Sequence, residues 1–133
     1  MPAVDSPQVA RKAGDALILA RIWGGFMALC HLGGLAGALA PFLVRTTYTS
    51  TAPVTTTFIS LAHHIVALVT AVMLLIGLRK ARFALLLVLV LAIARSASIL
   101  SLTPLGGVVG LAFALFLYVP PLVLMYWRPR EFR

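Results

Sequence analysis

Long apolar runs, separated by short polar segments, dominate the pattern of hydrophobic and polar positions along the chain. Four runs carry few charges and cover residues of about 16–43, 57–78, 83–102 and 104–127. The hydrocarbon core of a bilayer is about 30 Å thick and takes about 20 helical residues to cross. The sequence therefore predicts an all-α integral membrane protein, with four transmembrane helices in a single domain over residues 1–133.

The connections between these runs differ in length. A Thr-rich loop over residues 45–56 follows the first run, whereas residues 79–82 and 103–104 form very short turns. Turns this short join antiparallel neighbours, so the pattern predicts an up-down four-helix bundle. The first run is longer than the roughly 7–15 apolar residues of a signal peptide, and we expect it to be retained as a span.

Proline positions predict helix ends and one irregularity. Thr103-Pro104 supplies an N-cap threonine and an N1 proline for the last span. Ser6-Pro7 does the same for the segment PQVARKAG, which we interpret as a short N-terminal interfacial helix on the membrane surface. Pro120-Pro121 lies within the last span, where proline disfavours helical geometry in the residue before it, so we expect a kink or a break there.

Composition strengthens the membrane assignment. Hydrophobic residues make up 62% of the chain and charged residues 11%, against about 45–50% and about 25% in soluble domains. The formal net charge of +8 comes from 11 Lys and Arg against 3 Asp and Glu. Because the basic residues lie at the ends of apolar runs, they favour contact with lipid headgroups over nucleic-acid binding.

The basic residues also predict an orientation. Nine lie on one predicted side, and Arg45 lies on the other; the nine are Arg11, Lys12, Arg21, Arg79, Lys80, Arg82, Arg128, Arg130 and Arg133. The positive-inside rule then places both termini in the cytoplasm, and we expect a bacterial cytoplasmic (inner) membrane. Trp23, Tyr126 and Trp127 are expected at the cytoplasmic headgroup level, and Tyr48 at the outer one.

Small residues form rows on two of the spans. Helices in a bilayer associate through close backbone approach, which such rows permit. The rows comprise Gly24, Ala28, Gly34 and Ala38 in the first span and Gly106, Gly110 and Ala114 in the last. Two interpretations stay open at this point: packing between helices of this chain, or a face for a partner subunit or a flat cofactor.

Four ionisable residues, His31, His63, His64 and Arg95, fall at membrane depth, where such residues are costly and indicate function by default. A rise of about 1.5 Å per residue places them in roughly one layer. Adjacent helical residues diverge by about 100°, so we expect only one of His63 and His64 to face a given target. We therefore predict no metal site, and Cys30 has no second cysteine as a partner.

Three hypotheses account for this layer. In the first, each histidine bonds a serine, a threonine or a carbonyl, and Arg95 extends to the loop or to a lipid phosphate. In the second, a b-type haem or another pigment takes His31 and His64 (or His63) as axial ligands, with Arg95 facing a propionate. The third is a quinone, lipid or proton-relay site.

Catalysis by this chain is not expected. Its carboxylates, Asp5, Asp15 and Glu131, all lie outside the spans, so there is no acid–base pair and no acidic partner for a triad. The sequence therefore favours a non-catalytic accessory subunit of a larger, energy-transducing membrane complex. The alternatives are a haem-, pigment-, quinone- or lipid-binding protein that uses His31, His64 and Arg95, and a small homo-oligomeric transporter or channel.

Overall fold

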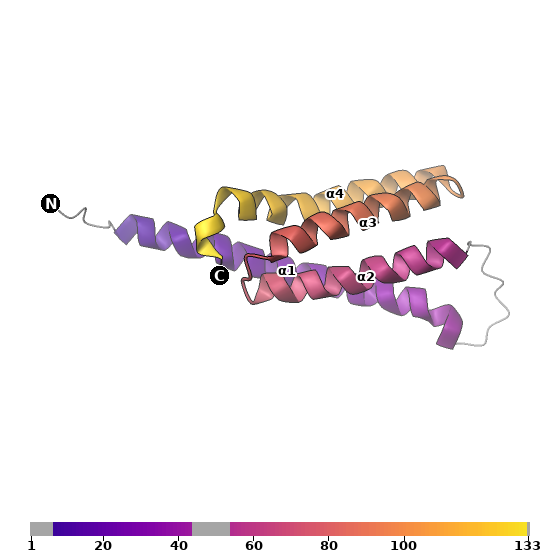
Figure 1. The fold of residues 1–133 in the computed structure, drawn as a ribbon, viewed down its shortest axis with the longest axis horizontal. Coiled ribbons are helices and arrows are strands. Elements are labelled where there is room, and N and C mark those ends of the chain that lie inside the picture. Colours follow the sequence, from indigo (N-terminus) through magenta and orange to yellow (C-terminus); the bar gives the residue numbers. More distant parts are fainter. Residues whose placement is uncertain (1–6, 44–53, 133) are drawn as a thin grey trace.

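A computed structural model of the chain shows four long helices and a short C-terminal 3-10 turn (Figure 1). It describes residues 7–43 and 54–132, and for residues 7–13, 41–42 and 54 the backbone alone. The elements are α1 (Pro7–Leu43), α2 (Val54–Leu75), α3 (Ala81–Leu100), α4 (Pro104–Trp127) and η1 (Pro129–Glu131). Ser6, Arg45, Tyr48 and the loop up to residue 53 lie outside the described residues.

All four helices are long and apolar enough to cross a membrane. Their candidate spans are Gly14–Ala40, Thr55–Leu75, Ala81–Leu100 and Pro104–Trp127. The described residues contain no strand. The prediction of an all-helical chain with four helices of membrane-spanning length is therefore confirmed.

The separate N-terminal interfacial helix was a wrong prediction. Residues 7–14 are the first turns of α1, which runs for 37 residues without interruption. A single glycine, Gly14, costs a helix only about 1 kcal/mol, which is too little to end it. At about 1.5 Å per residue α1 is longer than a bilayer core, and its N-terminal turns project beyond the bundle (Figure 1).

Helix α2 begins and ends about three residues earlier than predicted, and its earlier end is due to Gly77. Gly77 has φ +74, which glycine adopts readily, and it terminates the helix. The Leu78 N–H donates to Met73 O at 2.9 Å and the Gly77 N–H to Leu74 O at 3.1 Å, which is the Schellman pattern. By contrast, α4 has the predicted bounds, with Thr103 as N-cap and proline at the start.

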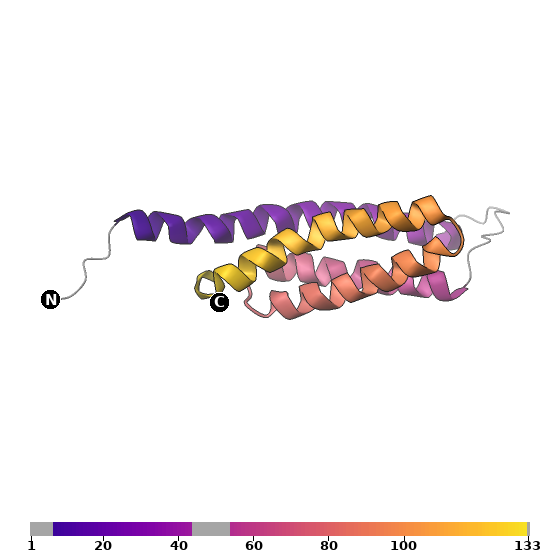
Figure 2. The ribbon, with the colours of Figure 1, turned by 90° about the horizontal axis from the view of Figure 1, so that it is seen from above.

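The helices pack in chain order: α1 lies along α2, α2 along α3, and α3 along α4, while α1 and α4 touch at few points (Figures 1 and 2). Gly24 faces α2, since a Cβ there would lie 2.9 Å from Ala71 O. Gly110 faces α3, since a Cβ there would lie 3.3 Å from Ser96 Oγ. At these two glycines the small-residue rows bring neighbouring helices of this chain together; Ala114 is buried, and Ala28 and Ala38 are half-buried.

The sequence predicted a kink or a break at Pro120-Pro121. Helix α4 does not break there, and the kink stays a prediction. Pro121 has no N–H to donate to Leu117 O four residues earlier. The indole Nε1–H of Trp23 on α1 donates to this carbonyl instead, at 2.6 Å. A neighbouring helix thus satisfies a backbone group that proline leaves free, which is how proline is tolerated in membrane helices. This role within the bundle was not foreseen for Trp23.

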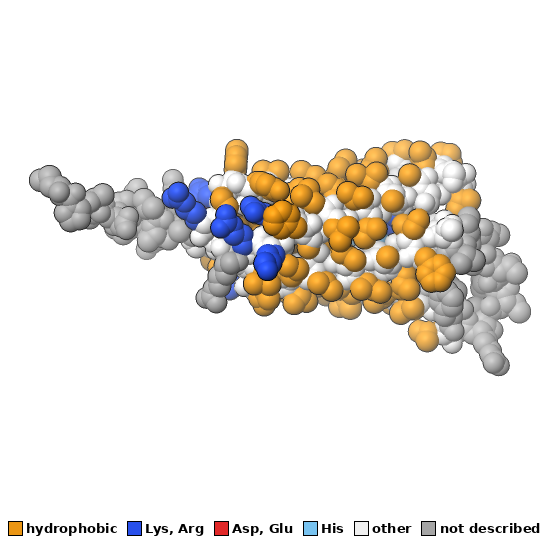
Figure 3. Space-filling model, in the orientation of Figure 1, with side chains coloured by type: hydrophobic (Ala, Val, Ile, Leu, Met, Phe, Trp, Pro, Cys, Tyr) orange, Lys and Arg blue, Asp and Glu red, His pale blue; other side chains and the backbone are white. Residues whose placement is uncertain are grey.

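Apolar side chains cover the outside of the bundle. Large hydrophobic residues on all four helices are exposed, as Figure 3 shows for one face. Lys and Arg gather at the end from which α1 projects. The basic residues at that end include Arg21, Arg79, Lys80, Arg128 and Arg130, all exposed. The segment η1 contacts α1 there, so the described parts nearest the two chain ends lie at one end of the bundle (Figure 1).

Candidate functional site

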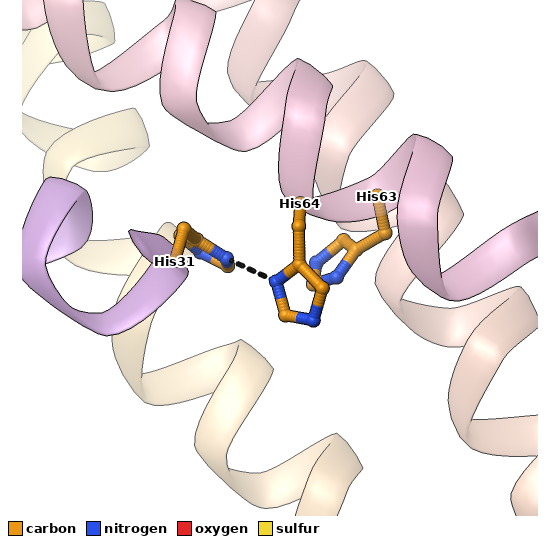
Figure 4. Close-up of side chains that lie close together, drawn as sticks. All are labelled: His31, His63 and His64. Atoms are coloured by element: carbon orange, nitrogen blue, oxygen red, sulfur yellow. Dashed lines mark hydrogen bonds between the residues drawn. The ribbon is translucent and has the colours of Figure 1, made fainter. Parts of the chain in front are cut away.

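Three histidines converge in the interior of the bundle. His31 comes from α1, and His63 and His64 come from α2, near the middle of both spans (Figure 4). Their exposed fractions are 3%, 3% and 5%. One ring nitrogen of each lies within 4.8 Å of the others. His31 Nδ1 and His64 Nδ1 are 3.0 Å apart, which is hydrogen-bond distance.

Only His64 hydrogen-bonds His31, as expected for one histidine of the doublet, but the His63 ring also lies beside His31, with its centroid 5.1 Å away. The expected absence of a metal site stays a prediction, although one nitrogen of each of the three rings lies within 4.8 Å of the others. Adjacent residues of a helix point about 100° apart, and the direction into the bundle lies between the His63 and His64 side chains. His64 therefore leans toward α1 and His63 toward α4, and the long imidazole side chains bring their nitrogens back together.

Tyr118 on α4 completes the cluster and was not singled out from the sequence. Its hydroxyl lies 2.7 Å from His31 Nε2 and 2.8 Å from His63 Nε2, and the residue is 1% exposed. A buried tyrosine usually needs a hydrogen-bond partner for its hydroxyl. Its position inside an apolar span was therefore the signal that it pairs with another polar residue.

The hydrogen bonds connect the four side chains in the order His64, His31, Tyr118, His63. His63 Nδ1 is buried and has no hydrogen-bond partner among the described residues. Buried polar atoms are normally paired, so an exception calls for an explanation. One ring nitrogen at this end of the cluster is free to meet a ligand.

Gly34 makes room for the His64 ring. A Cβ at Gly34 would lie 2.8 Å from both His64 Nδ1 and His64 Nε2. A side chain at this position would therefore displace the imidazole. The His64 ring therefore occupies the space that the missing side chain of Gly34 leaves.

Arg95 lines the same cavity as the three histidines, together with Cys30 and Ser96. It lies near the C-terminal end of α3, and helical side chains point back toward the N-terminus of their helix. Its Nε is buried without a hydrogen-bond partner among the described residues. This geometry does not favour the predicted contact of Arg95 with the loop or with lipid phosphate.

The first hypothesis expected serine or threonine hydroxyls to bond the histidines, but two such hydroxyls in the spans bond elsewhere. Thr70 Oγ1 donates to Val66 O at 2.8 Å, and Ser98 Oγ donates to Ala94 O at 3.0 Å. Both are bonds to the helix's own backbone. The histidines pair with one another and with Tyr118 instead.

The dimensions of the cluster suit a metal ion better than a large cofactor. The cavity has about 60 Å³ of space for water-sized groups, whereas small-molecule sites usually enclose about 300–1,000 Å³. A tetrahedral ion with metal–nitrogen bonds of about 2.0–2.1 Å holds its nitrogens about 3.3–3.4 Å apart. His31 Nδ1 and His64 Nδ1 lie 3.0 Å apart, close to this value, and the three ring nitrogens all lie within 4.8 Å of one another.

Comparisons with known proteins give no further guide to the site: a scan against protein-family models, a search of curated proteins and a search of solved structures each find no match.

Proposed function

We propose that this chain is a non-catalytic, multi-pass membrane protein that binds one transition-metal ion through His31, His63 and His64. The convergence of three buried imidazoles from two helices, with nitrogens within 4.8 Å, is the observation that carries the proposal. Imidazole is a preferred ligand of zinc, copper, iron and nickel. The free Nδ1 of His63 supplies a lone pair that no described residue uses.

Charge favours copper(I) among these ions. The cluster offers no carboxylate, since no Asp or Glu is among the residues that line its cavity. Three neutral imidazoles leave the charge of the ion uncompensated, and Arg95 adds a positive charge in the same cavity. Repulsion from Arg95 is twice as large for a divalent ion as for a monovalent one. The thiol of Cys30, which also lines the cavity, is a soft group of the kind that copper(I) prefers.

The haem, pigment and quinone hypotheses receive less support from the same geometry. A macrocycle has to lie between its two axial nitrogens, but His31 Nδ1 and His64 Nδ1 are in direct contact at 3.0 Å. The cavity is several times smaller than a site for a porphyrin or a quinone ring. A single ion with one or a few waters fits the space available.

A competition titration of the purified protein tests the metal proposal. With copper(I) kept reduced under anaerobic conditions, we expect one ion per chain. Replacing a ligand, as in His63→Ala, should weaken metal binding by more than about tenfold. Even the loss of a residue that only hydrogen-bonds a metal ligand typically lowers metal affinity by about 10–100-fold. Thr70→Ala is the matched control, since Thr70 is buried but bonds its own helix.

Two results would overturn this proposal. One is wild-type protein that takes up neither copper(I) nor zinc. The other is uptake that His31→Ala, His63→Ala and His64→Ala all leave unchanged, which would place the ion elsewhere. Tighter binding of zinc than of copper(I) would support the metal site but contradict the argument that charge favours a monovalent ion.

A second proposal, that the chain is an accessory subunit of a larger membrane complex, draws on the outer face of α1. Gly33 and Gly37 are exposed, and a Cβ at either would meet nothing within 4 Å. Their spacing is that of the GxxxG motif, which lets a second helix approach closely. The described helices of this chain leave that face uncovered, so a partner helix could occupy it.

Association in lipid tests the subunit proposal. We expect Gly33→Ile with Gly37→Ile to abolish co-purification with partner subunits from the native membrane, or self-association measured by energy transfer in vesicles. Ala62→Ile, on an exposed position of α2, is the matched control. A wild-type chain that stays monomeric and co-purifies with nothing contradicts the proposal.

A further inference from the structure

We infer that the cavity beside the histidines binds a small monovalent anion, with the Arg95 guanidinium as its counter-charge and the Ser96 hydroxyl as a second hydrogen-bond donor. Chloride is the simplest anion of this kind. The anion site uses none of the three histidine side chains. It is therefore a binding site in addition to the proposed metal centre and does not depend on it.

The first argument is that Arg95 has no acidic partner in its part of the chain. Residues 16–130 contain no Asp or Glu. Among the described residues the one ion pair joins Arg128 to Glu131, at the basic end of the bundle. Arginine keeps its charge in proteins, and a charge at membrane depth is costly unless it is paired. An anion from outside the chain would remove this cost.

The second argument is that donors in this cavity lack partners. Arg95 Nε is buried without a hydrogen-bond partner among the described residues. Ser96 is only 7% exposed and lines the same cavity. The Ser98 and Ser101 hydroxyls donate to nearby backbone carbonyls, whereas no described residue forms a hydrogen bond with the Ser96 hydroxyl. Because buried donors are normally paired, both groups call for an acceptor.

The missing side chain of Gly110 leaves room for a ligand at the Ser96 hydroxyl. A Cβ at Gly110 would lie 3.3 Å from Ser96 Oγ, so this hydroxyl is directed from α3 toward α4. Gly110 and Ala114, two members of the small-residue row in the last span, both line the cavity. This row therefore borders open space as well as a helix contact.

The size of the cavity favours a small anion over a lipid headgroup. Its space of about 60 Å³ holds a few water-sized groups, since one water needs about 10–15 Å³ by the same measure. A chloride ion is only slightly larger than a water molecule, whereas a lipid phosphate also carries glycerol and acyl chains. The single charge of Arg95 balances a monovalent anion but leaves sulfate or phosphate with uncompensated negative charge.

Apolar groups complete the lining and predict a selectivity. Ala92, Phe113 and Ala114 offer the anion no hydrogen bonds to replace its lost hydration. Burial of a charge costs free energy in proportion to the hydration that it gives up. We therefore expect weakly hydrated bromide and nitrate to bind at least as tightly as chloride, and strongly hydrated fluoride to bind most weakly.

The anion and a metal ion are compatible in one cavity. A monovalent anion beside Arg95 cancels the charge of the guanidinium. Copper(I) then adds one positive charge to the cavity and zinc adds two, so the preference for a monovalent metal ion remains. Because the two sites use different side chains, each can be removed by substitution without removing the ligands of the other.

Chloride binding to metal-free protein tests the anion site. The purified protein is freed of metal with a chelator, exchanged into chloride-free buffer and titrated with radioactive chloride by equilibrium dialysis. We expect saturable binding of one ion per chain. Arg95→Gln should abolish this binding, and Ser96→Ala should weaken it about tenfold, as is typical for loss of a hydrogen bond to a charged group. Arg79→Gln, at an exposed arginine, is the matched control and should bind as wild type.

A further variant and a second measurement separate loss of the site from loss of the fold. Arg95→Lys keeps a positive charge and should restore part of the binding that Arg95→Gln removes. Bound chloride should also raise the Tm of wild-type and Arg95→Lys protein, because it binds the folded state alone. The Tm of Arg95→Gln protein should not respond to chloride.

Three results would overturn the anion site. One is metal-free wild-type protein that shows no saturable chloride binding. Another is chloride binding that Arg95→Gln and Ser96→Ala both leave unchanged. The third is an anionic lipid that stays on wild-type protein in native mass spectrometry and is lost from Arg95→Gln, since lipid phosphate would then supply the counter-charge. Each of these results leaves the metal proposal standing, because copper(I) binding is measured separately.

Discussion

At the scale of single residues, the histidine cluster depends on the missing side chain of Gly34 as much as on the imidazoles themselves. Gly34 contributes only backbone where the His64 ring lies. Gly33, its neighbour in sequence, has open space where a side chain would begin. The two glycines therefore offer a matched pair of positions with opposite surroundings.

We predict that Gly34→Ala displaces His64 and disrupts the cluster. Overpacking of a buried site typically costs about 1–3 kcal/mol, so the unfolding free energy in detergent should fall by that amount and metal binding should weaken. Gly33→Ala, at an exposed position in the same helix, should leave metal binding unchanged and raise stability by no more than about 1 kcal/mol, since alanine is the better helix former. Equal effects of the two substitutions on stability and binding would show that His64 does not lie against Gly34.

At the scale of elements, α4 shows how a membrane helix tolerates two prolines in succession. Pro121 leaves Leu117 O without its usual intrahelical donor, and the Trp23 indole supplies one from α1. This bond also connects two helices that otherwise touch at few points. Trp23 therefore helps to close the bundle between its first and last helices.

We predict that Trp23→Phe destabilises the fold by about 1 kcal/mol, since hydrogen bonds between membrane helices average about 0.6 and reach about 2 kcal/mol. Pro121→Ala restores an N–H that can donate to Leu117 O within α4. In the Pro121→Ala protein, Trp23→Phe should therefore lower the unfolding free energy by a smaller amount. A double-mutant cycle of the two substitutions should give a coupling energy of at least about 0.5 kcal/mol. Trp127→Phe, at an 83% exposed position, is the control. A coupling of zero would contradict the account.

The sequence predicted the elements well where local chemistry decides them. The N-cap and proline at Thr103-Pro104 mark the start of α4, and the run of apolar residues marks its length. Errors arose where a local signal was overlooked or overvalued. Gly77 ends α2 through its positive φ, and Pro120-Pro121 does not end α4, because tertiary contact supplies the missing donor.

At the scale of the whole molecule, membrane depth was enough to identify candidate residues but not their geometry. His31, His63, His64 and Arg95 were named because ionisable groups are costly in a bilayer, and all four line one cavity. Their mutual distances depend on how α1 packs against α2, which hydropathy does not encode. Tyr118 was not identified as a member of the cluster because a tyrosine in an apolar span resembles any other hydrophobic residue until its hydrogen-bond partners are known.

The distribution of basic residues predicts the orientation of the whole bundle. Exposed Lys and Arg gather at one end of the described structure (Figure 3). By the positive-inside rule we expect both termini to face the cytoplasm of a bacterial cell. A C-terminal green fluorescent protein fusion should then fluoresce, and a C-terminal alkaline phosphatase fusion should be inactive. The reverse pair of results would contradict the orientation.

The central claim is that three histidines form a metal centre inside the bundle, and X-ray absorption of the copper(I)-loaded protein tests it most directly. We predict a first shell of about three nitrogen scatterers near 2.0 Å with the outer-shell pattern of imidazole, as expected for histidine ligands. His63→Ala should reduce that shell by one nitrogen. A first shell of oxygens or sulfurs without imidazole features, unchanged in His63→Ala, would contradict the claim.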